Sequence, residues 1–190
     1  MTSSDASAVL EASAAALSGI GSQLPSTLEE AMLYFADPVI ATKFFSTVRW
    51  ADGAECPYCR SKEKHSYLTT RHIWKCKSCR KQFSPKAETI LEDSPLGLKQ
   101  WLTALWIVAN SRGALHSAKL HRSLGVTRTT AKFMLQRIRQ VAPSESEAEP
   151  EGTEFGRFLR LVEAVAGVSR PETEAQDSIP QPALQAHCEG

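Results

Sequence analysis

Long apolar runs and N-terminal positive charge are both missing from this sequence of 190 residues. No stretch approaches about 18 consecutive apolar residues, so the sequence predicts no transmembrane helix. Residues 1–41 contain neither lysine nor arginine. The Ala/Ser-rich start therefore lacks the basic region of a secretory signal and the arginines of a transit peptide. These absences predict a cytoplasmic protein with no membrane partner.

The charges that are present are segregated along the chain, although the formal net charge is only +1. Residues 1–41 hold five acidic residues and no basic ones, residues 42–140 hold 19 basic and 6 acidic residues, and residues 141–190 hold 3 basic and 10 acidic residues. A basic middle segment between two acidic ends indicates a polyanion as the partner.

Composition divides the chain into five segments. We expect a disordered Ala/Ser-rich leader over 1–24, short helices over 25–53, a cysteine-rich ribbon over 54–86, a helical domain over 95–141 and a tail over 142–190. The tail holds the acidic linker SESEAEPEG, one amphipathic helix with apolar residues from Phe155 to Val165, and a disordered end. We interpret that apolar stripe as a docking or self-association face.

Helix start signals mark the 25–53 segment. The pairs Ser26–Glu29 and Thr27–Glu30 each have the spacing of a capping box. Asp37-Pro38 combines an N-cap residue with a proline at the first helical position. We expect a second short helix to run from there to about Thr47.

Four cysteines form two pairs, Cys56–Cys59 and Cys76–Cys79, with sixteen residues between the pairs. This matches the C-x2-C…C-x2-C spacing of zinc sites. Four thiolates complete a tetrahedral shell, so we predict one structural Zn²⁺ and no open catalytic position. A redox role for either pair is the alternative. The surrounding basic residues offset the charge of the zinc–thiolate centre, contact DNA, or do both: Arg60, Lys75, Lys77, Arg80 and Lys81.

Two helical patterns meet at a turn within the 95–141 segment. Residues 117–124 and 127–141 each carry an apolar stripe, and Gly125 between them tolerates the left-handed backbone of a sharp turn. Thr127 is a good N-cap for the second helix. We interpret the pair as a helix-turn-helix whose second helix presents to a DNA major groove Arg128, Thr129, Lys132, Gln136 and Arg137. A solvated face in a small helical bundle is the alternative.

These patterns predict an α+β array of small domains. A zinc ribbon of three short antiparallel strands, at about 66–70, 73–75 and 82–84, is flanked by N-terminal helices and followed by the helical domain, with disordered ends. We expect the aromatic residues of the helical domain to lie in its core rather than to stack on nucleic acid: Trp101, Trp106 and Phe133.

Residues 27–141 resemble the N-terminal part of insertion-sequence transposases that carry a leading zinc ribbon. The resemblance rests on the order of YFAD at 34–37, VRWADG at 48–53, CPYC at 56–59, WKCKSCRKQFS at 74–84 and LGVT at 124–127. It implies a bacterial, cytoplasmic protein. It also implies that the ribbon and the helix-turn-helix engage double-stranded DNA at the terminal inverted repeats of the element.

The same resemblance implies a DDE catalytic domain of RNase H-like fold after Val141, and the sequence departs from the family there. DDE chemistry needs carboxylates on separate strands to hold two metal ions. The acids of residues 42–140 follow no such pattern: Asp52, Glu55, Glu63, Glu88, Glu92 and Asp93. We therefore expect the DNA-binding part of a truncated transposase, with activity only if completed in trans. The alternatives are a stand-alone regulator or inhibitor of transposition, the DNA-binding half of a split transposase that recruits a separately encoded catalytic half, and a zinc-stabilised adaptor. A homo-oligomer is a further possible partner.

Overall fold

The computed structural model of the chain describes residues 24–111, 116–142 and 153–167. The expected leader before residue 24, the acidic linker and the chain after residue 167 lie outside these ranges. The described elements are, in chain order, α2 (Leu28–Tyr34), α3 (Pro38–Arg49), β1 (His65–Leu68), β2 (Ile73–Cys76), β3 (Gln82–Phe83), α4 (Leu98–Ala109), α5 (Ser117–Leu124), α6 (Arg128–Arg139) and α7 (Glu154–Ala166).

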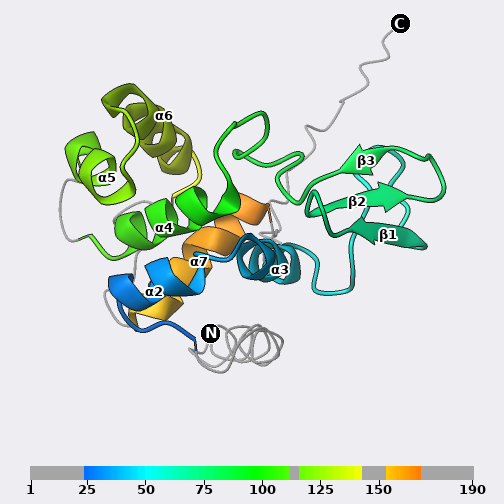
Figure 1. The fold of residues 1–190 in the computed structure, drawn as a ribbon, viewed down its shortest axis with the longest axis horizontal. Coiled ribbons are helices and arrows are strands. Elements are labelled where there is room, and N and C mark those ends of the chain that lie inside the picture. Colours follow the sequence, from blue (N-terminus) through cyan, green and yellow to red (C-terminus); the bar gives the residue numbers. More distant parts are fainter. Residues whose placement is uncertain (1–23, 112–115, 143–152, 168–190) are drawn as a thin grey trace, which may run out of the picture.

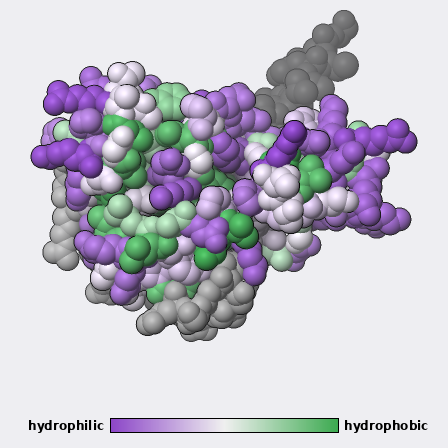
Figure 2. Space-filling model, in the orientation of Figure 1, coloured by the Kyte–Doolittle hydropathy of each residue, from purple (hydrophilic) through white to green (hydrophobic). Residues whose placement is uncertain are grey.

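The helices gather in one part of the molecule and the three strands form a smaller part at its other end (Figure 1). The helix α3 leads into the strands, and the segment 84–97 leads from them to α4. The strand part is mostly hydrophilic at its surface, whereas apolar residues are more frequent over the helices (Figure 2). This arrangement confirms the expected α+β class. None of the described helices has the length and apolar character needed to cross a membrane.

The sheet has the strand order β1–β2–β3, and both pairs of neighbours are antiparallel. Tyr67 lies opposite Trp74, and Trp74 lies opposite Phe83. Because cross-strand partners share a face, these three rings lie together: the centroids of Tyr67 and Trp74 are 4.9 Å apart, and Trp74 and Phe83 stack at 6.3 Å. The strands are the expected ones, with ends displaced by no more than two residues.

Both N-terminal helices begin at expected caps. Thr27 and Glu30 form the capping box of α2, in which each side chain accepts from the other residue's backbone N–H at 3.3 Å. Ser26 also donates to the Glu30 carboxylate through its N–H and its hydroxyl, both at 2.7 Å. These hydrogen bonds favour the ionised form and lower the pKa of Glu30. Asp37 caps α3 by accepting from the N–H of Val39 at 2.7 Å.

One hydrophobic core joins the helices, with α4 in contact with α2, α3, α5, α6 and α7. Trp101 and Trp106 of α4 are buried in it, as expected. The indole N–H of Trp101 donates to the hydroxyl of Ser94 at 3.0 Å. This bond holds the segment before α4 against the core.

Phe133 differs from that expectation, because its side chain is 41% exposed. The buried stripe of α6 consists of Ala131, Met134, Leu135 and Ile138. Phe133 lies about 200° around the helix from Leu135 and therefore faces away from that stripe. The prediction of a core position for Phe133 was wrong.

The apolar stripe of α7 belongs to the core, so the interpretation as a docking face was also wrong. Phe158 is fully buried, and its ring stacks on Phe44 of α3 at a centroid distance of 5.7 Å. At the end of α4, the Asn110 side chain donates to the first carbonyl oxygen of α7 and accepts from Nε of Arg157, each at 3.1 Å. The apolar residues of α7 are therefore covered within the chain.

Candidate metal centre and nucleic-acid interface

The four predicted cysteines converge on one point. All their Sγ atoms lie within 4.8 Å of one another, with Cys56 and Cys79 at 3.6 Å and Cys59 and Cys76 at 3.7 Å. Tetrahedral zinc with Zn–S bonds of about 2.3 Å separates its sulfurs by about 3.8 Å. The soft thiolate donors and their spacing therefore fit Zn²⁺. Within the part of the chain that the structure describes, no other group of three or more potential ligands lies together.

The two cysteine pairs have the same backbone geometry. The N–H of Cys56 donates to the carbonyl of Ser61, and the N–H of Cys76 donates to the carbonyl of Lys81, both at 3.0 Å. The residue after each second cysteine is left-handed, with φ of 57° at Arg60 and 63° at Arg80. This conformation is uncommon for a residue with a side chain. It bends the backbone around each pair of sulfurs.

Backbone groups near the sulfurs shift the thiol pKa values. The N–H groups of Cys79 and Ser78 donate toward Cys76 and lower the pKa of its thiol to about 6. At Cys59 the N–H of Ser61 acts in the same direction, but desolvation and the neighbouring sulfurs outweigh it and raise the pKa of that thiol to about 12. The neighbouring sulfurs thus oppose ionisation of the Cys59 thiol. A divalent cation bound to all four sulfurs offsets this repulsion, so that neighbouring thiolates can coexist.

The ribbon has a small core of its own. Cys56, Cys76 and Phe83 are buried there, and Trp50 packs edge-on against Trp74 at 5.3 Å and against Phe83 at 5.8 Å. So few apolar side chains stabilise a fold only weakly, and structural zinc sites contribute an apparent ~10–16 kcal/mol. The metal is therefore the main stabilising element of the ribbon.

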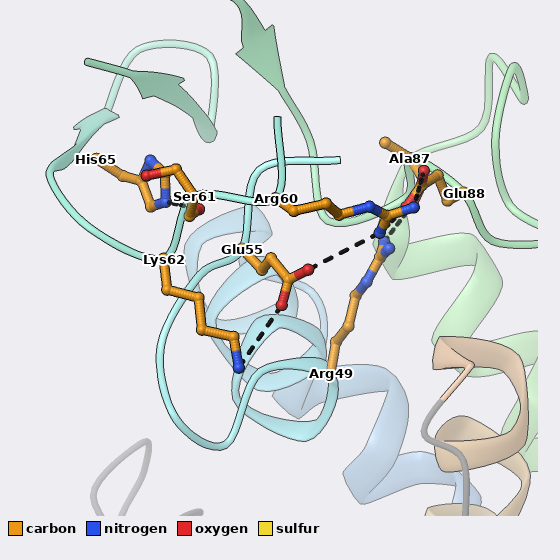
Figure 3. A network of polar contacts seen from close by, with 8 residues as sticks. All are labelled: Arg49, Glu55, Arg60, Ser61, Lys62, His65, Ala87 and Glu88. Atoms are coloured by element: carbon orange, nitrogen blue, oxygen red, sulfur yellow. Dashed lines mark hydrogen bonds and ion pairs between the residues drawn. The ribbon is translucent and has the colours of Figure 1, made fainter. Parts of the chain in front are cut away.

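Arginine side chains fix the segment that follows the ribbon. Arg49 of α3 donates to the carbonyl oxygens of Pro85, at 2.5 Å, and Ala87. Arg60, in the first cysteine turn, pairs with both carboxylate oxygens of Glu88 at 2.9 and 3.0 Å. Figure 3 shows the two guanidinium groups side by side at this segment. Glu55 faces Arg60 from the other side, at 3.9 Å, and also pairs with a lysine of the ribbon.

The same segment is held from its other side by α6. Nη1 of Arg137 donates to the carbonyls of Ile90 and Glu92 at 2.6 and 2.7 Å. Its guanidinium group also lies 4.5 Å from the ring centroid of Phe133. Arg137 was predicted to contact DNA, and the structure places it in contact with the connecting segment.

The turn between α5 and α6 has the expected form. Gly125 adopts φ 64° and ψ 21°, the left-handed conformation that glycine tolerates best. The Thr127 hydroxyl accepts from the N–H of Thr130 at 3.1 Å and caps α6. Leu120 of α5 is fully buried in the helical core. The helices α5 and α6 pack against each other on either side of the turn.

The remaining predicted DNA contacts lie on the outer face of α6. Arg128, Thr129, Lys132 and Gln136 are all exposed. Residues 94–142 contain no aspartate or glutamate, and neither Arg128 nor Lys132 forms an ion pair within the described residues. Glu92 and Asp93 of the connecting segment lie beside Gln136, so the unpaired positive charge is at Arg128 and Lys132. Contact of these residues with DNA stays a prediction.

The organising roles of Arg49 and Arg60 were not predicted from the sequence. The partners of these side chains lie 28 to 38 residues away, and those of Arg137 lie 45 and 47 residues away. Most acceptors are backbone carbonyls, which every residue carries. No local spacing or residue type signals such an interaction.

The cysteine-rich segment is similar to a known protein family. Residues 40–82 match the family described as the transposase zinc-ribbon domain. The matched residues run from within α3 to the start of β3 and are similar to a transposase zinc ribbon. The ribbon holds one structural zinc ion, as its four clustered cysteines indicate. The match confirms the resemblance to insertion-sequence transposases with a leading zinc ribbon.

One curated relative of the zinc-ribbon chain is an uncharacterized protein in transposable element ISH50 of Halobacterium salinarum. It is 29% identical over 68 residues, which is 35% of this chain and 23% of the relative. The match thus spans about a quarter of that protein's length. No solved structure matches the chain.

Proposed function

We propose that residues 24–167 are the DNA-recognition part of an insertion-sequence transposase. The observation that carries the proposal is the exposed N-terminal end of α6, where Arg128 and Lys132 form no ion pair within the described residues, in a chain that also carries a zinc ribbon similar to those of transposases. The phosphate backbone of DNA is densely negatively charged, and exposed basic side chains attract it. The relative's occurrence in a transposable element is in keeping with this role.

In this proposal α5 and α6 act as a helix-turn-helix. The N-terminal end of α6 carries Arg128, Thr129 and Lys132, and this end of a recognition helix usually meets base edges. Gln136, one turn further along, can hydrogen-bond an adenine edge. Arg137 acts as a positioning residue in this arrangement, because its guanidinium group is engaged by the carbonyls of Ile90 and Glu92. The terminal inverted repeats of the element are the proposed target.

The ribbon serves two purposes in the proposal. Its zinc stabilises the local fold, and its exposed basic residues contact phosphates without reading sequence. Residues 54–86 hold nine basic and two acidic residues, so part of this charge remains after the zinc–thiolate centre is offset. Together the ribbon and α6 extend the interface along the duplex.

The test begins with selection of bound duplexes from a randomised pool by the zinc-loaded chain. The affinity for the selected duplex is then compared with that for a scrambled duplex, at several salt concentrations. The double variant Arg128→Ala/Lys132→Ala should lose about 5- to 150-fold in affinity for each base that is no longer bound, and its log–log salt slope should fall by about 0.9 for each phosphate that is no longer neutralised.

Lys99→Ala is the matched control, because Lys99 is an exposed basic residue on α4 and does not belong to the proposed recognition helix. This variant should bind the selected duplex as the unaltered chain does. Equal affinities for the α6 double variant and the unaltered chain would remove the recognition-helix assignment. Equal affinity for selected and scrambled duplexes would remove sequence recognition altogether.

A further inference from the structure

A groove of about 360 Å³ runs between α3 and the ribbon. Its wall on the α3 side includes Val39 and Thr47, and Trp50 closes its end. Its opposite wall includes Tyr67 and Trp74 of the ribbon sheet. Neither the zinc site nor the α6 face contributes a residue to it. The groove is therefore distinct from both sites described above.

Three aromatic rings, of Trp50, Tyr67 and Trp74, line the groove. The centroids of Trp50 and Trp74 lie 5.3 Å apart, and those of Trp74 and Tyr67 lie 4.9 Å apart. The packing leaves part of this apolar surface accessible, since Tyr67 is 39% and Val39 is 47% exposed. A flat aromatic ligand can therefore reach the rings from solvent. The hydroxyl of Thr47 makes no hydrogen bond to any described residue and can bond the edge of such a ligand.

The ribbon, which forms one wall of the groove, carries an excess of positive charge. It belongs to a segment with nine basic and only two acidic residues. On the opposite wall, Lys43 of α3 lines the groove itself. A ligand suited to this place is a polyanion that also carries flat aromatic groups. Nucleic acid combines the two properties.

We propose that this groove binds an unpaired nucleobase, with the phosphates of its strand following the basic surface of the ribbon. A paired base is stacked on both faces within the duplex, so only an unpaired one can place its face against protein rings. The volume of the groove lies at the lower end of the range for small-ligand sites, which suits a single base. The proposal rests on the proposed DNA-binding function and shares the basic surface of the ribbon with it, but the base is bound by residues of the groove that the duplex interface does not use.

The test uses the full zinc-loaded chain and a labelled oligothymidylate of about ten nucleotides, a typical length for single-strand sites. Binding is measured at one fixed salt concentration, because phosphate binding depends on salt. Tyr67→Leu removes one ring of the groove and should weaken binding about 5- to 150-fold, the range for loss of one stacked base. Oligothymidylate should also quench the fluorescence of Trp50 and Trp74, whereas the fully buried Trp101 should not respond.

Two further variants make the result specific. Tyr58→Leu removes another exposed ribbon tyrosine, which lies outside the groove and against Lys81, and it should leave oligothymidylate binding unchanged. Val39→Trp fills the groove from α3 without altering the ribbon, and it should weaken binding as Tyr67→Leu does. Circular dichroism and zinc content show that each variant is folded.

Unchanged oligothymidylate binding in folded Tyr67→Leu and Val39→Trp overturns the proposal. An equal loss in Tyr58→Leu also overturns it, because the effect then belongs to the whole ribbon surface. Duplex affinity separates this proposal from the DNA-recognition function: the groove variants should leave affinity for the selected duplex unchanged, and the α6 double variant should leave affinity for oligothymidylate unchanged. Each proposal can therefore fail while the other stands.

Discussion

Arg60 links two parts of the molecule through one residue. Its left-handed backbone completes the first cysteine turn, and its guanidinium group pairs with Glu88 in the segment after the ribbon. Arg80 has the equivalent backbone in the second turn. The metal ligands are therefore supported by neighbours whose conformation, rather than their charge alone, shapes the site.

At this scale we predict that Cys76→Ser abolishes zinc binding. A serine hydroxyl cannot replace a buried thiolate as a zinc ligand, and the three remaining cysteines leave the tetrahedral shell incomplete. Metal analysis of the purified chain should fall from about one zinc per chain to well below one. Cys188→Ser is the control, because Cys188 has no cysteine partner in the sequence, and it should retain the full zinc content. A Cys76→Ser variant with one zinc per chain would contradict the assigned ligand set.

The helix α6 is the element with two distinct faces. One face is apolar and buried against α5 and α4, and the other is basic and exposed. Arg137 lies between these faces and holds the segment 84–97 through two carbonyl oxygens. The position of α6 is thus coupled to that of the ribbon through this segment.

We predict that Arg137→Met destabilises the helical part by about 1.5–3 kcal/mol. The variant loses two hydrogen bonds that the charged guanidinium group donates, and it leaves two backbone carbonyls without their donor. Lys132→Met, an exposed site on the same helix, should change stability by less than about 0.5 kcal/mol. Urea unfolding followed by circular dichroism measures both values. Equal stabilities of the two variants would show that Arg137 does not hold the segment.

At the scale of the whole molecule, two cores of unequal size lie side by side. The larger joins helices that are far apart in the chain, including α2 and α7. The smaller lies in the ribbon around Cys56, Cys76 and Phe83. The larger core is stabilised by buried apolar area, whereas the smaller depends on its metal.

We predict that Phe158→Ala lowers the free energy of unfolding by about 3–5 kcal/mol, the usual cost of emptying a buried phenylalanine site. Phe133→Ala is the matched control, since that ring is 41% exposed, and it should cost about 1 kcal/mol or less. Denaturant titration compares the two. A small effect at Phe158 would mean that α7 is not part of the stabilising core.

Removal of zinc should unfold the ribbon and leave the helices folded. A strong chelator should therefore change the fluorescence of Trp50 and Trp74 while the helical circular dichroism signal persists. Thiols bind protons in competition with zinc, so the zinc affinity should fall as the pH falls from about 8 to about 6. The Cys59 thiol, with a pKa of about 12, is protonated throughout this range and must release its proton when zinc binds. Loss of the helical signal together with the metal would contradict the existence of two separately stabilised cores.

Residue types and short spacings were enough to predict the local features of the fold. Residue type and spacings of a few residues set the zinc ligands, the caps at Thr27 and Asp37, and the turn at Gly125. These features could therefore be predicted from the sequence alone. The three strands could be placed for the same reason, because the two cysteine pairs bracket the hairpin. These features depend on geometry within one turn or one hairpin.

Which faces of the helices and strands pack together could not be predicted from the sequence. An apolar stripe indicates that α7 is covered but not by what, and the structure covers it with α3 and α4 of the same chain. A basic residue on a helix can face solvent or donate to backbone carbonyls. Lys132 does the first, and Arg137 does the second. The aromatic groove forms because α3 and the ribbon lie beside each other. Each of these features depends on residues that are far apart in the sequence, and the packing of the whole molecule brings them together.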